Sequence, residues 1–210
     1  MALSALTLCA FVDRLASADP TPGGGSASAT VGSIAAGLVQ MVARLTSGSP
    51  KFSAVAERAD GIGNAAQGLR AAFLQCIDDD AAAFDRVSVA YKMARASDAE
   101  KVSRTAAIQE TLLAAAGPPL RVIELAHETA LLAAALVDIG NPNVASDIGC
   151  AALCAQAAAQ GAAFNVRINI KGLKDEHAAQ DCRDRMHRAL AQVDLLSQVV
   201  WAKVQTGLGV

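Results

Sequence analysis

The chain has 210 residues, 53% of them hydrophobic but only 3% aromatic, with a formal net charge of −2. This length suits one domain, residues 1–210, with a substantial core. Because 18 basic and 20 acidic residues nearly balance, no global field attracts nucleic acid or a membrane surface. The few aromatic side chains also exclude a stacking platform for single-stranded nucleic acid. Abundant alanine predicts closely approaching helices.

The cysteines are five in number and contain no CxxC pair. Cys150 and Cys154, one helical turn apart, could join a metal site, but the nearest histidines, His127 and His177, lie in other segments. We therefore expect buried free thiols, no bound metal and a reducing cytoplasm.

Two long stretches, 26–43 and 148–166, contain no charged residue and approach the length of a membrane span. Both are rich in Ala, Gly, Ser and Gln, and neither has flanking aromatic belts. This composition favours central helices of a soluble bundle over membrane spans. The apolar start, Met1–Ala10, lacks basic residues, so no signal peptide is expected.

Helical periodicity covers almost the whole chain, which predicts an all-α, single-domain helical bundle. Ser97–Glu100 is a capping box that starts a helix, whereas Gly117-Pro118-Pro119 and Gly140-Asn141-Pro142 predict breaks. The expected helices cover residues 3–16, 26–46, 53–94, 97–116, 120–139, 148–166 and 175–208.

A proline–glycine turn, Asp19-Pro-Thr-Pro-Gly-Gly-Gly-Ser26, precedes the first uncharged helix. Prolines favour an extended approach, and three glycines permit backbone angles closed to other residues and a close approach of a ligand. The first N–H groups of a helix have no internal partner and carry its positive dipole end. The turn is therefore either a site for a carboxylate, phosphate or polar heterocycle, or a simple entry to the helix. Small residues along the helix, such as Ser28, Gly32 and Ala36, predict another backbone close by.

An apolar seam with alternating spacings of three and four runs through residues 53–94, and Asp80 is its one polar member. A carboxylate on a packed seam is costly unless it is paired, hydrogen-bonded or protonated. Asp80 is therefore the best catalytic candidate, the alternative being a satisfied structural aspartate or a seam that opens to solvent. Asp78, Asp79 and Asp85 fall off the seam and are expected in solvent. The apolar members are Val55, Ala59, Ile62, Ala66, Leu69, Phe73, Cys76, Ala83 and Val87.

Polar residues flank both ends of the second uncharged stretch. Ser146 and Asp147 either cap that helix or present polar groups to a pocket beside the glycine turn. Asn165 and Asn169 lie at its exit.

Nine motifs occur in order along nearly the whole chain: Phe11-Val-Asp-Arg-Leu-Ala-Ser17, Pro20-Thr-Pro-Gly-Gly-Gly-Ser26, Met41-Val42, Asp79-Asp80 with Ala83-Phe84-Asp85, Arg104 with Ile108-Gln109, Pro119-Leu120, Gly140-Asn141 with Asn143, Ser146-Asp147, and Asn165-Val166 with Asn169. In these motifs the chain resembles the cyclodeaminase/methenyltetrahydrofolate cyclohydrolase family, which includes the C-terminal half of formiminotransferase-cyclodeaminase. One departure is Ala94-Arg95, where the family usually carries Pro-Lys; arginine keeps the charge but not the geometry.

The resemblance implies an all-helical homodimer that binds a tetrahydrofolate derivative and needs neither metal nor nucleotide. The length favours the stand-alone cyclohydrolase, which adds water to 5,10-methenyltetrahydrofolate and yields 10-formyltetrahydrofolate. The alternatives are a cyclodeaminase, which closes 5-formiminotetrahydrofolate and expels ammonia, and a non-catalytic folate-binding protein of the same fold.

The resemblance also implies roles for individual residues. Asp80 would orient or deprotonate the attacking water and stabilise the methenyl cation, and Asp147 would handle the proton of the departing ring nitrogen. The glycine turn would hold the pterin or a carboxylate of the glutamate tail, and the two arginines are candidates for that tail. The implied substrate-binding residues are Pro22, Gly23, Gly24, Gly25, Ser26, Arg95, Arg104, Asn143, Ser146, Asn165 and Asn169.

Overall fold

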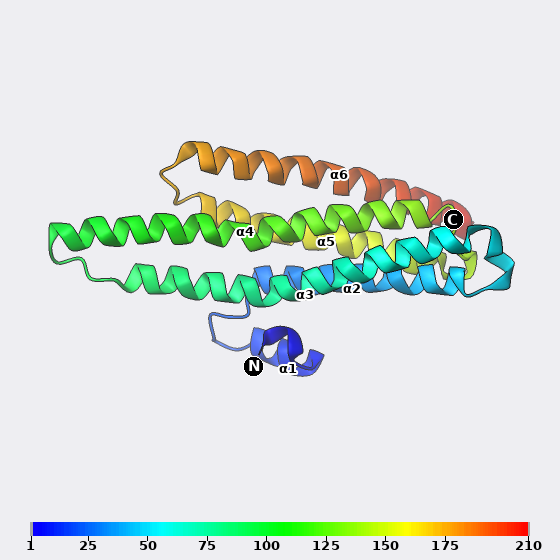
Figure 1. The fold of residues 1–210 in the computed structure, drawn as a ribbon, viewed down its shortest axis with the longest axis horizontal. Helices are drawn as coiled ribbons and strands as arrows, with labels where there is room; N and C mark the ends of the chain where they lie inside the picture. The colour runs from blue at the N-terminus through cyan, green and yellow to red at the C-terminus, as the bar shows by residue number, and fades with distance from the viewer. Residues whose placement is uncertain (1, 210) are drawn as a thin grey trace.

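The computed structural model describes residues 2–209, and helices account for most of them (Figure 1). No strand occurs among these residues, so the prediction of an all-α fold is confirmed. The elements in chain order are η1 (Leu3–Ala5), α1 (Leu8–Leu15), α2 (Gly24–Ser47), η2 (Pro50–Val55), α3 (Ala56–Lys92), α4 (Asp98–Leu136), η3 (Pro142–Val144), α5 (Ala145–Ile170) and α6 (Glu176–Leu208).

Five long helices, α2 to α6, run along the long axis of the molecule, and α1 projects from the bundle (Figure 1). The helix α2 packs against α3 and α5, while α4 packs against α3, α5 and α6. The start of α2 lies beside the end of α5, because a Cβ on Gly24 would contact Asn165. The end of α2 shares a core cluster with the start of α5, through Val42 and Ile148. The two uncharged stretches are therefore antiparallel neighbours.

Small residues allow these helices to approach closely, as the spacing along α2 predicted. A Cβ on Gly32 would overlap the ring of Phe73 in α3. On the other side, a Cβ on Gly161 of α5 would lie 2.6 Å from the hydroxyl of Ser28. Glycine at these positions lets a buried phenylalanine and a neighbouring helix occupy the space of a side chain.

The seam along α3 faces the core as predicted. Its members from Ala59 to Cys76, together with Ala83, are buried, and Asp80 is half-buried. Asp79 and Asp85 are exposed, as expected. Asp78 was wrongly expected in solvent: it is half-buried, and its carboxylate accepts hydrogen bonds from the backbone N–H and the hydroxyl of Ser4 and from the N–H of Leu3, the last at 2.6 Å.

Three predictions of local structure were wrong. The expected helix 3–16 is divided into η1 and α1. The expected break at 117–119 does not occur, since α4 continues through Pro118 and Pro119. Two prolines remove two intrahelical hydrogen bonds, but the helix is held by packing on α3, α5 and α6. The first uncharged helix was expected to begin at residue 26, after the glycines, but Gly24 already begins α2, and Gly23 before it is extended, with φ −123°.

Among residues 2–209, α2 is the one helix that is long and apolar enough to cross a membrane. A buried core helix meets the same criterion, and 56% of the apolar window of α2 is buried inside the bundle.

Candidate functional site

A cavity of about 410 Å³ lies where the start of α2 meets the second half of α3, the middle of α4 and the end of α5. Its volume falls in the range of small-molecule sites. The lining residues are Pro20, Thr21, Gly23, Gly24, Gly25, Asp80, Ala83, Phe84, Val87, Tyr91, Leu112, Ala115, Asn165, Ile168 and Asn169.

Among residues 2–209, Asp80 is the one side-chain carboxylate that lines this cavity. The hydroxyl of Ser26, which is buried in the first turn of α2, donates to Oδ2 of Asp80 at 3.0 Å and lies equally close to the carbonyl of Ile77. A Cβ on Gly25 would overlap the carboxylate. Because Gly25 has no side chain, the carboxylate of Asp80 can lie directly against the first turn of α2. The hydrogen bond from Ser26 fixes the orientation of that carboxylate.

Burial raises the pKa of Asp80 above its ordinary value, and hydrogen bonds from the side chain and backbone of Ser26 act in the opposite direction. Desolvation disfavours the charged form of a carboxylate. A cationic ligand in the cavity would therefore recover part of the lost solvation of Asp80. The site can stabilise positive charge and can accept a proton more readily than a solvated aspartate.

The side chain of Asn169 is held by a hydrogen bond to a backbone carbonyl that Pro119 leaves without its intrahelical donor. Because proline has no N–H, the carbonyl of Ala115, four residues earlier, lacks its intrahelical donor. That carbonyl accepts a hydrogen bond from Nδ2 of Asn169 at 2.8 Å. Asn165, one turn earlier in α5, instead donates to the carbonyl of Gly161 at 3.1 Å. Both amides line the cavity beside the glycine turn.

The two arginines assigned to the glutamate tail lie outside the cavity lining. Arg104 is half-buried, donates from Nη2 to the carbonyl of Tyr91 at 3.0 Å, and places its guanidinium 5.8 Å from the ring centroid of Tyr91. Its buried Nε has no hydrogen-bond partner among residues 2–209. Arg95 is exposed in the connection between α3 and α4. Arg104 thus contacts Tyr91, which lines the cavity, but does not line the cavity itself. Arg95 lies beyond Tyr91, where α3 connects to α4.

Asn143, Ser146 and Asp147 lie at the opposite end of α5 from the cavity. Eighteen residues separate Asp147 from Asn165, which corresponds to about 27 Å along a helix. No side chain caps α5, and Ser146 and Asp147 lie within its first turn. Within one chain, these three residues do not join the lining around Asp80. Pro22 is buried next to the lining but is not part of it.

Sequence reasoning missed the apolar walls of the cavity. Phe84, Val87 and Tyr91 follow Asp80 along α3, and Leu112 and Ile168 face them from α4 and α5. The exposure of Ile168, at 70%, leaves this wall open. The spacing of Phe84 and Tyr91 from Asp80, at four and eleven residues, was an available signal, since such positions share one helix face.

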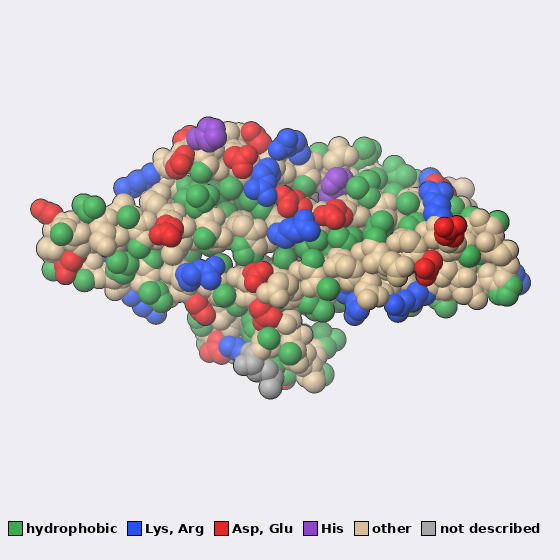
Figure 2. All heavy atoms as spheres, in the orientation of Figure 1, with side chains coloured by type: hydrophobic (Ala, Val, Ile, Leu, Met, Phe, Trp, Pro, Cys, Tyr) green, Lys and Arg blue, Asp and Glu red, His purple; other side chains and the backbone are tan. Residues whose placement is uncertain are grey.

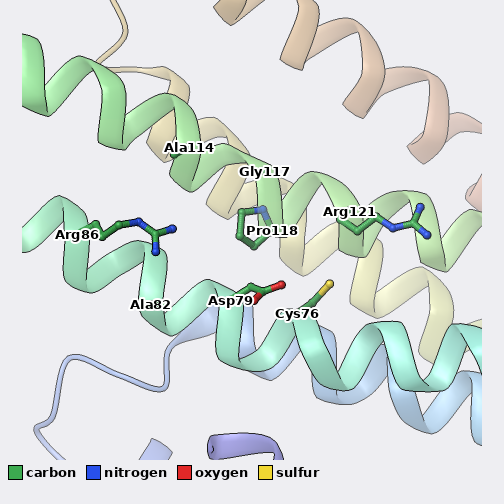
Figure 3. Close-up of a pocket in the computed structure, with 8 residues that line it drawn as sticks. All are labelled: Cys76, Asp79, Ala82, Arg86, Ala114, Gly117, Pro118 and Arg121. Atoms are coloured by element: carbon green, nitrogen blue, oxygen red, sulfur yellow. The ribbon is translucent and has the colours of Figure 1, made fainter.

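A second groove lies on the outer side of α3 and α4, with Asp79 and Cys76 between Arg86 and Arg121 (Figure 3). Arg121 is already paired with Glu124 and Glu128. Burial is the main cause, and the negative charge of Asp79 the second, that raises the pKa of Cys76 to about 11. The thiol therefore stays protonated at neutral pH. This groove therefore offers no activated nucleophile.

The cysteines follow the expectation of buried free thiols only in part. All five are free; Cys76 and Cys182 are buried and Cys154 is half-buried, but Cys9 and Cys150 are exposed. No group of three or more His, Cys, Asp or Glu side chains within residues 2–209 could hold a metal ion.

A helical bundle with a half-buried carboxylate in a largely apolar cavity defines a small-molecule site that favours cationic ligands and proton transfer. Residues 7–188 match the sequence profile of the formiminotransferase-cyclodeaminase family. The chain belongs to this family.

Individual relatives give the same result. The chain is 38% identical over 200 residues to a methenyltetrahydrofolate cyclohydrolase of Methylorubrum extorquens, covering 95% of this chain and 96% of that protein. It is 29% identical to the formimidoyltransferase-cyclodeaminase of Rattus norvegicus over 95% of its own length, but spans only 37% of that protein. The crystal structure of a formiminotetrahydrofolate cyclodeaminase from Thermotoga maritima superimposes with a TM-score of 0.88 at 30% identity, covering 98% of this chain and 99% of that chain.

Proposed function

We propose that this protein is a cytoplasmic methenyltetrahydrofolate cyclohydrolase, which converts 5,10-methenyltetrahydrofolate and water into 10-formyltetrahydrofolate. The observation that carries the proposal is the desolvated carboxylate of Asp80 in an otherwise largely apolar cavity. The substrate contains a cationic carbon between two nitrogens, and a desolvated carboxylate is complementary to such a charge. The similarity to a cyclohydrolase over nearly the full length of both chains supports the same assignment.

Asp80 acts on the water in this mechanism. The water oxygen bonds to the bridging carbon while Asp80 accepts one of the water protons, which leaves a neutral tetrahedral carbinol. The bond from that carbon to the ring nitrogen N5 then breaks as the hydroxyl loses its proton and N5 gains one. The products are 10-formyltetrahydrofolate and one released proton. The electrophile belongs to the substrate, so the reaction requires neither a metal nor a nucleotide.

Residues around Asp80 position the substrate. The backbone N–H groups of Gly24 and Gly25 at the start of α2, together with the amides of Asn165 and Asn169, face polar atoms of the pterin. Phe84 and Tyr91 provide aromatic surface at the cavity wall. Arg104 and Arg95 lie toward the glutamate tail, where the unpartnered Nε of Arg104 supplies a donor.

The protein acts as a homodimer, in which α2 and α5 are the central helices. Asp147 supplies the second carboxylate, with Asn143 and Ser146 beside it. Because these residues lie far from Asp80 within one chain, their participation depends on a second copy.

Cyclodeamination of 5-formiminotetrahydrofolate is the second candidate. It is favoured by the similarity to the Thermotoga maritima cyclodeaminase. Both reactions pass through a tetrahedral carbon between two nitrogens, so the same carboxylate can serve either.

The test is to follow the ultraviolet band of 5,10-methenyltetrahydrofolate with purified protein against the uncatalysed rate, and to measure ammonia from 5-formiminotetrahydrofolate in parallel. Rapid loss of the band without ammonia supports the cyclohydrolase. Ammonia release would assign the cyclodeaminase. Folded protein that binds folate but turns over neither compound would be a non-catalytic folate-binding protein and would overturn both assignments.

A further inference from the structure

The hydroxyl of Ser26 lies between two hydrogen-bond acceptors at equal distance. It is 3.0 Å from Oδ2 of Asp80 and 3.0 Å from the backbone carbonyl of Ile77, three residues earlier in α3. A serine hydroxyl carries one proton, so it donates to only one of these oxygens at a time. Ser26 is fully buried, so bulk water does not supply a second donor.

The packing of α2 on α3 holds the hydroxyl between these two acceptors. Ser26 belongs to the first turn of α2, which lies directly against α3 because Gly25 has no side chain. Ile77 is buried as well, at 3% exposed. As a carbonyl inside α3, its oxygen accepts from the N–H of Ala81 and keeps a second lone pair for Ser26. Both acceptors are therefore available to the same hydroxyl without any movement of the helices.

The charge on Asp80 decides which acceptor is the better one. A hydrogen bond to an ionised carboxylate is about twice as strong as one between neutral groups, so an ionised Asp80 is preferred over the carbonyl of Ile77. A protonated Asp80 loses this advantage and gains an O–H donor of its own. The carbonyl of Ile77 is then the stronger acceptor, and a lone pair of the Ser26 oxygen faces the acid.

We propose that Ser26 is a positioning residue whose O–H turns between Asp80 and Ile77 as a proton enters and leaves the carboxylate. While Asp80 is ionised, Ser26 donates to Oδ2. When Asp80 takes a proton from the attacking water, the O–H of Ser26 rotates to the carbonyl of Ile77, and Oγ accepts the acid proton when that proton lies on Oδ2. The Ser26 O–H bond stays intact throughout. When Asp80 gives up its proton, the O–H of Ser26 turns back.

This rotation gives both protonation states of Asp80 a hydrogen-bonded partner while only a hydrogen atom moves. Such a site costs little reorganisation each time the carboxylate is protonated and deprotonated. Ser26 does not line the cavity, whereas Gly24 and Gly25 do, so Ser26 acts on the substrate through Asp80. The role of the rotation in turnover rests on the proposed function, but the rotation itself does not.

The surroundings contain no competing charge. Among residues 2–209, no other charged side chain lines the cavity around Asp80, and Tyr91 is the other titratable residue of the lining. On α3 itself, Asp79 is exposed, Asp78 is bound by the N-terminal segment, and Cys76 keeps its proton at neutral pH. Basic and acidic side chains are instead spread over the outer face of α3, α4 and α6 (Figure 2). The hydrogen bonds of Ser26 are therefore the ones that respond when Asp80 changes its charge.

Infrared spectroscopy tests the rotation without substrate. In protein labelled with ¹³C only at the carbonyl carbon of isoleucine, lowering the pH until the acid band of Asp80 appears should move one labelled amide band to lower frequency. Ile77→Leu removes the label from that carbonyl and identifies the band. Ser26→Ala and Asp80→Asn should each abolish the movement. A band of Ile77 that stays in place while Asp80 is protonated, or that still moves in Ser26→Ala, would overturn the rotation.

Steady-state kinetics tests the positioning role. Ser26→Ala should lower kcat by at least about tenfold, the value of a hydrogen bond to a charged group, and should leave KM close to that of the wild type. The acid limb of its pH profile should move to higher pH, because the stronger of the two lost bonds is the one to the ionised carboxylate. Ser33→Ala is the matched control, since that hydroxyl of α2 donates only to the carbonyl of Thr30, at 2.8 Å, and it should change neither kcat nor the profile.

Two failures are distinguishable. A folded Ser26→Ala variant with the kcat and pH profile of the wild type would overturn the positioning role. Absence of turnover by the wild type would instead overturn the proposed function and leave the infrared result standing.

Discussion

The carboxylate of Asp80 occupies the space that a Cβ at Gly25 would fill. The first turn of α2 and the buried face of α3 thus pack in direct contact at the cavity, and this contact requires glycine at position 25. Gly25→Ala should displace the carboxylate, and a misplacement of about 1 Å costs roughly a hundredfold in turnover. Gly68→Ala is the matched control in an exposed part of α3, where an added Cβ meets nothing within 4 Å. The control should keep full activity and gain about 0.5–1 kcal/mol in unfolding free energy. Equal activity of the two variants would show that Asp80 tolerates displacement.

Asp80→Asn should lower turnover by more than about a hundredfold, because it removes the proton acceptor and the charge that faces the substrate cation. The same change should stabilise the protein at neutral pH, since the desolvated charge is lost while an amide oxygen can still accept from Ser26. Each 1 kcal/mol gained would raise the Tm by about 2–4 °C for a chain of this size. Steady-state rates and thermal unfolding measure both effects. A folded variant with near-normal turnover would remove Asp80 from the mechanism.

The pH dependence of stability and activity follows from the raised pKa of Asp80. Its pKa is raised in the folded state, so the folded protein binds this proton more tightly than the unfolded chain does. The stability contributed by protonation is present at low pH and is lost as the pH rises through the folded pKa. Activity needs the ionised form, so kcat/KM should fall as the pH is lowered, with a midpoint above the ordinary aspartate value of 3.8. A midpoint at or below that value would contradict a desolvated base.

Pro119→Ala should separate folate affinity from stability. The new N–H can bond the carbonyl of Ala115 and compete with Asn169, so KM should rise by up to about tenfold, the value of one hydrogen bond. Unfolding free energy should not fall, because alanine suits a helix interior better than proline.

Pro118→Ala is the control for this variant. The carbonyl that Pro118 leaves without a donor belongs to Ala114, and both residues line the outer groove (Figure 3). Its KM should match the wild type. Equal KM values for the two proline variants would mean that Asn169 does not depend on the missing N–H.

Local patterns in the sequence were sufficient for the helices and for the candidate carboxylate. The three-and-four spacing along α3 predicted which residues face the core and left Asp80 as the polar exception. The capping box at Ser97–Glu100 starts α4 as predicted. These inferences succeeded because side-chain direction in a helix repeats every 3.6 residues, so a short stretch of sequence determines it.

Other sequence inferences failed where long-range contacts outweigh local preference. Pro118 and Pro119 are helix-breaking by themselves, yet packing against neighbouring helices carries α4 through them. The apolar walls of the cavity could not be told from core residues, because the same residue types serve both purposes.

By itself, the sequence determined an all-helical chain and a carboxylate on a buried seam. Only the tertiary structure decided that Gly25, Asp80 and Asn169 surround one cavity and that Asp147 lies at the other end of α5. The reason is physical: a helix separates residues by 1.5 Å each along its axis, so residues distant in the chain meet only through the packing of one helix on another.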